Sequence, residues 1–279
     1  MPVGRAFYLF LRKIITMNAH EIDYRIHGEE MQHVEIELDP NETAIAESGA
    51  FMMMDDGIQM ETIFGDGNQQ QGGFMSKLFS AGKRLLTGES LFMTAFTNVG
   101  QGKKQVHFAS PFPGKIIAMN LAEHGGKMTC QKDAFLCAAK GVSVGIEFQR
   151  KLGTGIFGGE GFIMQKLEGD GMAFVHAGGH VHERRLAPGE VLKIDTGCVV
   201  AYTKEIDFDV QFVGGIKNTI FGGEGLFFAT LRGPGIVWIQ SLPISRLASR
   251  IMAYGSFGRR KEEGGILGGL GNILDGDGR

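Results

Sequence analysis

Hydrophobic and polar residues alternate along most of the chain in short stretches, and Gly-rich turns separate these stretches. Residues 191–194 are interpreted as an alternating strand, whereas the segment GFIMQKL, residues 161–167, is apolar on both faces at its start. A period of two residues is typical of strands with one buried face, and short apolar runs between turns indicate strands covered on both faces. The pattern therefore predicts a mainly β protein in which sheets pack against one another.

A Gly-rich sequence, IFGGEG, begins two similar regions of the chain. Residues 156–177 and 220–241 are identical at nine of 22 aligned positions, whereas chance gives about one or two. Residues 87–109 contain a third, weaker copy. A Gly-Glu pair stands at the same place in all three copies, and we interpret it as a structural corner; the corner residues are Gly88, Glu89, Gly159, Glu160, Gly223 and Glu224.

A second landmark precedes each corner, namely a leucine followed by a polar turn and an alternating segment. The separations are 51 residues from Leu38 to Glu89, 39 from Leu121 to Glu160 and 38 from Leu186 to Glu224. Such short copies do not bury both faces of their sheets alone, so we expect them to share one core around an approximate threefold axis. The predicted fold is a pseudo-threefold repeat of β-sandwich or double-stranded β-helix-like modules with a few short helices.

A helix is expected to close the β body. Pro243 suits its first turn, an apolar stripe runs through Ile244, Leu247 and Ile251, and Gly255 is expected to end it. The organisation predicted from these signals is an N-terminal extension (1–16), one β body (17–257) with copies at 31–110, 111–179 and 180–243, a helix at 244–254, and a Gly-rich flexible tail (258–279).

Composition narrows the class of partner and the compartment. The chain has 28 Lys and Arg against 31 Asp and Glu, and this net charge of -3 does not favour nucleic acid as a partner. The 44 glycines without a collagen-like period indicate many tight turns. The 3 cysteines form no C-x-x-C pair and stand in apolar runs, so we expect buried thiols in a reducing compartment and a cytoplasmic protein.

Membrane association and targeting depend on the termini. No apolar run reaches about 18 residues, so no transmembrane helix is expected. Residues 1–16 are cationic, apolar and free of acids, which suits a transit peptide or a membrane-surface anchor. The preferred interpretation is an upstream extension of a protein that begins at Met17, and association with a membrane surface is kept as an alternative.

The Gly-rich corners have two possible chemical roles. Gly153, Gly155 and Gly158 match G-x-G-x-x-G, but a strand follows them instead of the helix that a dinucleotide site needs. We therefore interpret the motif as a turn and predict no cofactor. The three corner glutamates would form a cation site if the repeat brought them to one axis. The preferred role is structural, with each carboxylate accepting hydrogen bonds from its own corner.

Two further constellations have metal-binding potential. His180 and His182 stand two residues apart, which places both rings on one face of a strand, and His176 is close in sequence. This spacing serves metals in cupin-like barrels, but Glu183 follows at once and points to the other face, so an exposed polar strand is preferred. The run FMMM, residues 51–54, alternates faces, and we interpret it as apolar filler between sheets rather than a soft-metal site.

Several segments together resemble a known family. They are EIDYRIHG, SGAFMMMDDGI, the FGGEG corners, LAPGEVLKIDTGCVVAYT and the Gly-Leu tail. They resemble small bacterial and archaeal proteins related to a mitochondrial biogenesis protein known for altered inheritance of mitochondria. The resemblance begins near Met17, is most specific over residues 186–225, and implies a fold similar to the tryptophan RNA-binding attenuation protein (TRAP-like). It implies no established activity and supplies no catalytic residues.

The function expected from the sequence is that of a non-catalytic binding or scaffold protein, with a homo-oligomer as a possible assembly. Its partners are not identified by any motif. The alternative from another class is a metal-dependent, cupin-like enzyme or small-molecule binder that uses His180 and His182. A second alternative is a protein bound peripherally to a membrane.

Overall fold

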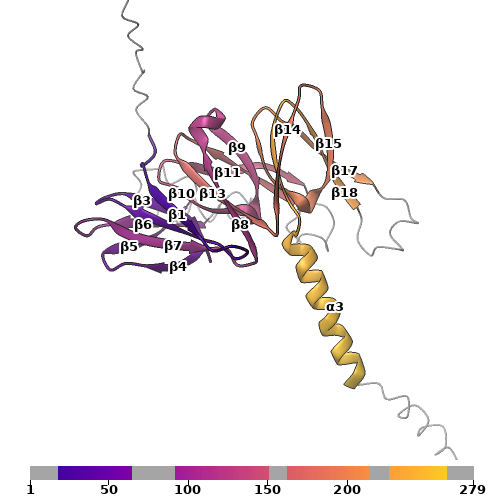
Figure 1. Ribbon diagram of the computed structural model, residues 1–279, viewed down its shortest axis with the longest axis horizontal. Coiled ribbons are helices and arrows are strands. Elements are labelled where there is room, and N and C mark those ends of the chain that lie inside the picture. The colour runs from indigo at the N-terminus through magenta and orange to yellow at the C-terminus, as the bar shows by residue number, and fades with distance from the viewer. Residues whose placement is uncertain (1–17, 65–91, 151–161, 214–225, 263–279) are drawn as a thin grey trace, which may run out of the picture.

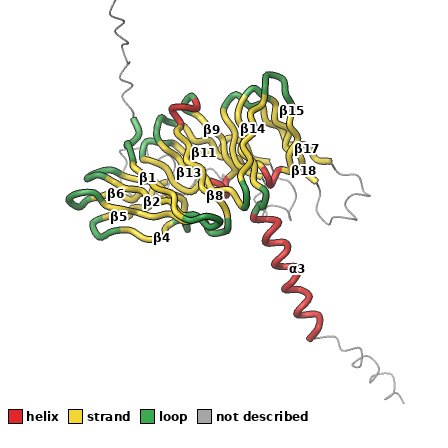
Figure 2. Tube along the Cα trace, in the orientation of Figure 1, coloured by secondary structure: helices red, strands yellow, loops and turns green. Residues whose placement is uncertain are grey.

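Strands dominate the protein, as the sequence predicts (Figure 2). The computed structural model describes residues 18–64, 92–150, 162–213 and 226–262. Within these ranges the chain forms nineteen strands, three short 3-10 helices and one α-helix. The prediction of a mainly β protein with few helices is therefore confirmed.

The strands follow one another closely along the chain. The first part contains β1 (Asp23–His27), β2 (His33–Leu38), β3 (Thr43–Glu47), β4 (Phe51–Met54), β5 (Ile58–Phe64), β6 (Phe92–Asn98) and β7 (Lys104–Ala109). The middle part contains β8 (Gly114–Asn120), β9 (Lys127–Gln131), β10 (Phe135–Ala139), β11 (Ser143–Arg150), β12 (Phe162–Glu168) and β13 (Met172–Gly178), with 3-10 helices η1 (Leu121–His124) and η2 (Lys132–Ala134). The last part contains β14 (Val181–Leu186), β15 (Val191–Asp195), η3 (Thr196–Cys198), β16 (Val199–Thr203), β17 (Asp207–Val213), β18 (Leu226–Arg232), β19 (Gly235–Gln240) and helix α3 (Ile244–Glu262).

The described strands pair into four antiparallel sheets. Their strand orders are β1-β2-β7-β4 (sheet A), β5-β6-β3-β10-β13-β8 (sheet B), β11-β12-β9-β16-β19-β14 (sheet C) and β15-β18-β17 (sheet D). Figure 1 shows β4, β5 and β7 at one end of the β body and β15, β17 and β18 at the other. The sheets therefore follow the order of the chain from end to end.

The same pairing order recurs in three consecutive groups of six strands, which we call the first (β2–β7), middle (β8–β13) and last (β14–β19) strand groups. In each group the sixth strand lies between the first and third, and the fifth lies between the second and fourth. Each predicted copy, at 31–110, 111–179 and 180–243, contains one group. The duplication and the threefold axis stay predictions.

The third strand of each group also has the same irregularity. Its register against the sixth strand shifts between the first residue and the third, at Phe51/Met53 in β4, Phe135/Cys137 in β10 and Val199/Ala201 in β16. Such a β-bulge inserts one residue and bends the strand. The bulge therefore marks equivalent positions in the third strands of the three groups.

The core forms because alternating residues point to opposite faces of a strand. In β2, Val34, Ile36 and Leu38 are fully buried, and the residues between them are partly exposed. One hydrophobic cluster contains Ile45 of the first group, Met128 of the middle group and Trp238 of the last. Each such side chain contributes about 1.5–3 kcal/mol when it is fully buried. The three groups therefore share apolar contacts.

Helix α3 begins where the sequence predicts and ends later. The amides of Arg246 and Leu247 both donate to the carbonyl of Pro243 at its first turn. The helix then continues through Gly255 to Glu262, so the predicted end at residue 254 was wrong. A single glycine costs an exposed helix only about 1 kcal/mol, which is too little to stop it. Figure 1 shows α3 extending away from the sheets.

Replacement of a core phenylalanine tests this packing. Phe108 is fully buried, and its ring meets the edge of the Phe96 ring at 5.1 Å between centroids. We expect Phe108→Ala to lower the free energy of unfolding by about 3–5 kcal/mol, because it leaves a cavity in the first group. Urea unfolding followed by circular dichroism measures this. Val99→Ala, at a side chain that is 57% exposed, is the control and should change stability by less than about 0.5 kcal/mol.

Candidate functional site

The predicted Gly-Glu corners lie outside the described residues. This applies to Gly88, Glu89, Gly159, Glu160, Gly223 and Glu224. Their structural role and the possible cation site formed by the three glutamates therefore stay predictions.

The three histidines considered for metal binding lie in different environments. His176 is in β13 and only 3% exposed, whereas His180 and His182 are exposed, just before and within edge strand β14. The His180 amide donates to Ser241 Oγ at 2.9 Å, which ties the start of β14 to the end of β19. Among the described residues, no three His, Cys, Asp or Glu side chains form a group that could hold a metal ion. The structure thus does not bring these histidines together as ligands.

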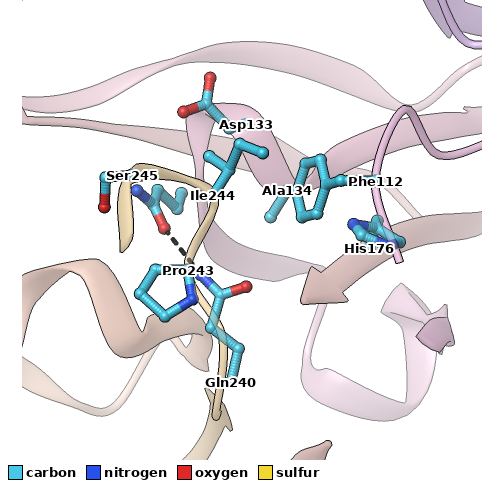
Figure 3. Close-up of a pocket in the computed structure, with 9 residues that line it drawn as sticks. Phe112, Asp133, Ala134, His176, Gln240, Pro243, Ile244 and Ser245 are labelled. Carbon is cyan, nitrogen blue, oxygen red and sulfur yellow. Dashed lines mark hydrogen bonds between the residues drawn. The ribbon is translucent and has the colours of Figure 1, made fainter. Parts of the chain in front are cut away.

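His176 instead lines a small cavity between the end of β13, η2, the end of β19 and the start of α3. Figure 3 shows the side chains that surround it. The lining residues are Phe112, Gln131, Asp133, Ala134, His176, Gln240, Pro243, Ile244 and Ser245. The cavity volume is about 20 Å³, which is enough for about one water molecule. A substrate of ordinary size does not fit.

The His176 ring is held mainly by apolar contact. It meets the Phe112 ring edge-on, with 4.4 Å between centroids, and neither ring nitrogen has a hydrogen-bond partner among the described residues. Burial lowers the pKa of His176 to about 4, and the Phe112 backbone offsets only part of this effect. The imidazole is therefore neutral near pH 7 and does not serve as an acid there.

Gln240 links the strands around this cavity. Its Oε1 accepts a hydrogen bond from the Gly178 amide at 2.7 Å, and its Nε2 donates to the Gly197 carbonyl at 2.8 Å. The same Nε2 lies 3.5 Å from Gln131 Oε1. These bonds satisfy buried polar groups of β9, β13 and η3. The polar side chains of the cavity thus hold the middle and last strand groups together.

A histidine cluster on the outer face of sheet A was not predicted from the sequence. The rings of His27 and His33 stack with 4.9 Å between centroids, and His107 lies 5.5 Å from His33. His27 Nε2 is 2.9 Å from Glu35 Oε2. Burial, and then the neighbouring His27 and His107, lower the pKa of His33. The cluster comes from three strands and has no common motif, so only strand pairing reveals it.

Strand β4 contains an exposed apolar surface, contrary to the prediction that FMMM fills the space between sheets. Its four side chains are 41%, 49%, 47% and 37% exposed, in the order Phe51, Met52, Met53 and Met54. The corresponding third strands, β10 and β16, are buried at every position. The difference arises because β4 is a sheet edge, whereas β10 and β16 each have a neighbour on both sides.

The helices bear on the question of membrane association. None of the helices in the described parts of the chain is long and apolar enough to span a bilayer. Helix α3 nevertheless has large exposed apolar side chains, among them Ile251, Met252 and Tyr254.

Fold and site together define a class: a mainly antiparallel β protein built of linked sheets, in which the edge strand β4 exposes four consecutive apolar side chains. The chain belongs to the family described as mitochondrial biogenesis AIM24, which matches residues 24–242. This confirms the resemblance seen in the sequence.

Two relatives come from Streptococcus pyogenes. An uncharacterized protein of serotype M6 is 30% identical over 224 residues, which cover 79% of this chain and 86% of that protein. A crystal structure of a protein from this species has a TM-score of 0.66 and 25% identity, and the match covers 84% of this chain and 100% of that one. The fold is therefore similar to one that has been solved, and the names of these relatives state no activity.

Acid should destabilise the protein partly through His176. Its pKa is about 4 in the folded protein against 6.5 as the ordinary value, so the unfolded chain binds more protons between these pH values. Stability therefore falls as the pH drops from about 6.5 to about 4, by about 3 kcal/mol from this group. We expect His176→Gln to remove this part of the fall, measured by urea unfolding at several pH values. His182→Gln is the exposed control, and equal pH slopes for wild type and His176→Gln would contradict the assignment.

Glu47 should have the opposite pH dependence. Burial, reinforced by Asp133 and opposed by Lys132, raises the pKa of Glu47 to about 7 from 4.5. The folded protein then binds more protons, so its stability falls as the pH rises from about 4.5 to about 7. We expect Glu47→Gln to stabilise the protein at pH 8 by about 1–2 kcal/mol relative to its effect at pH 4.5, after solvent screening. Thermal unfolding at both pH values measures this, with Glu61→Gln on β5 as the exposed control. A pH-independent effect would refute the shift.

Proposed function

We propose that this protein is a non-catalytic scaffold protein of the cytoplasm that acts by contact with other protein chains through strand β4. The exposed apolar edge of β4 is the observation that carries this proposal. Four consecutive large apolar side chains stand there at a sheet edge. Natural proteins usually protect an edge strand with charges, proline or a covering loop, because an open edge pairs with other chains. An unprotected apolar edge of this kind marks an interaction site.

The chemistry of the cavity supports a non-catalytic role. It admits about one water molecule, its histidine is neutral near pH 7, and Gln240 is engaged in bonds between strands. These residues stabilise the junction of the middle and last groups. The metal-dependent alternative based on His180 and His182 is not proposed, since neither approaches His176 in a ligand group within the described residues.

The cysteines support a reducing compartment. Cys130, Cys137 and Cys198 are free and buried. Burial raises the pKa of the Cys130 and Cys137 thiols, so they remain protonated and unreactive. They behave as small apolar core residues, which fits a cytoplasmic protein. Peripheral membrane association stays a prediction from the sequence.

A charge placed on the β4 edge tests the proposal. We expect the protein in gently lysed cells to migrate on native gels in a complex larger than its own 30.3 kDa. Met53→Lys should reduce it to the monomer, because burying an unpaired ammonium at an apolar contact is costly. Met60→Lys is the matched control, since Met60 is 46% exposed and Met53 is 47% exposed, but Met60 lies on β5.

Two results would refute the scaffold function. One is a wild-type protein that migrates only as a monomer at its cellular concentration. The other is a complex that Met53→Lys leaves intact while the variant remains folded by circular dichroism.

A further inference from the structure

Two edge strands differ from all others in the described sheets, and the assembly inferred from them rests on the proposed function of β4. The edge strands are β1, β4, β5, β8, β11, β14, β15 and β17. The fourth strands of the groups, β5, β11 and β17, are edges in all three. The first strands of the middle and last groups, β8 and β14, are also edges. Their counterpart in the first group, β2, is not an edge because β1 pairs with it. Only β4 and β15 are edges although their counterparts in the other two groups are paired on both sides.

The counterparts of β4 and β15 pair with each other. The second strand of the first group, β3, pairs with the third strand of the middle group, β10. The second strand of the middle group, β9, pairs with the third strand of the last group, β16. This junction thus occurs twice within the chain. The last group offers its second strand, β15, and the first group offers its third strand, β4, without a partner among the described strands.

We propose that β15 of one copy of this chain pairs with β4 of a second copy, and so repeats the internal junction between molecules. The paired sheets A and D would have the strand order β1-β2-β7-β4-β15-β18-β17. Sheets B and C have the same arrangement. In each of them, the fourth, fifth and second strands of one group are followed by the third, sixth and first strands of the next group. The junction would therefore complete the one pattern that a single chain leaves unfinished.

The register of the junction follows from the internal copies. Ala201, the first residue after the bulge in β16, pairs with Cys130 of β9. Met53 has the same place after the bulge in β4. On the other side, Met128 of β9 pairs with Leu167 and Leu192 of β15 pairs with Leu231, and these two leucines align in the repeated sequence. Cys130 lies two residues after Met128, and Ile194 lies two residues after Leu192. Ile194 therefore corresponds to Cys130 and would lie opposite Met53, which places Lys193 opposite Met54.

Burial supports this pairing. Thr129 and Tyr202 face each other in the internal junction and are 2% and 5% exposed. Their counterparts, Lys193 and Met54, are exposed in the single chain. In the proposed junction, the aliphatic part of Lys193 would cover Met54. Its ammonium would point toward Asp56, which lies two residues beyond Met54 and is a diagonal neighbour.

The positions of the two edges decide which copy supplies the partner strand. Figure 1 shows β4 and β15 at opposite ends of the β body. They do not meet within one chain, so the partner must be another molecule. Each copy has one edge of each kind, and the contact is therefore head-to-tail. Such an interface produces a closed ring when its rotation closes and a filament when it does not.

A charge exchange at one pair tests the register. The purified full chain should sediment as a multiple of 30.3 kDa. Met54→Lys places like charges opposite each other and should weaken assembly by at least about tenfold in Kd. Adding Lys193→Glu to that variant should restore assembly, because opposite charges then face each other across the junction. Circular dichroism confirms folding of both variants, and Met60→Lys is the matched control.

Cross-linking tests the same pair directly. Residues opposite each other in an antiparallel pair have Cα atoms about 4.5–5.5 Å apart, within the range of a disulfide. Mixing a Met54→Cys chain with a Lys193→Cys chain should yield a covalent dimer on oxidation. Mixing Met60→Cys with Lys193→Cys should not. The three native cysteines are buried and free.

The outcomes separate this proposal from the scaffold function. A purified protein that stays monomeric, or a Met54→Lys variant that Lys193→Glu does not rescue, would overturn the pairing of copies. If Met53→Lys still dissolves a complex in cells, then β4 binds a different protein and the scaffold function stands. If neither purified nor cellular protein forms a complex, both proposals fail.

Discussion

The structure depends on backbone hydrogen bonding between strand groups. At β3–β10 and β9–β16, neighbouring groups share one sheet, so their central strands have a partner on each side. Each such bond contributes only about 0.5–1.5 kcal/mol net, but a buried backbone group left unpaired costs more. The junctions therefore allow β10 and β16 to be buried along their whole lengths. Without them, two apolar strands would lie at exposed edges, as β4 does.

The need to pair buried backbone groups also explains the contacts of buried polar side chains. The side chain of Gln240 is used to satisfy amide and carbonyl groups around the cavity. His176 is enclosed there, and its burial lowers its pKa. Glu47 stands at the end of β3, near Asp133, and has the opposite shift. Both shifts arise mainly from burial, and they make the stability of the protein depend on pH.

The sequence predicted the strands well, but it did not indicate the histidine cluster or the exposure of β4. Alternation in β2 and the apolar run in β12 gave the correct class because each depends on neighbours one or two residues away. The end of α3 was misplaced because Gly255 weakens a helix without stopping it. His27, His33 and His107 meet across three strands, and no local spacing indicates such a cluster. The FMMM segment was assigned to the interior because its composition is that of a core strand.

Local sequence determined which segments are strands, where the chain turns and which side chains are apolar, since these properties depend on covalent geometry and short-range sterics. Tertiary structure alone decided which apolar strands are covered. Phe51–Met54 and Phe135–Ala139 are similar in character and hold the same place in their groups. One is exposed and the other buried, because a strand from another group lies beside β10, whereas among the described strands none from another group lies beside β4. Whether a strand is buried depends on its pairing with segments that are distant in the sequence. The sequence of the strand alone does not specify that pairing.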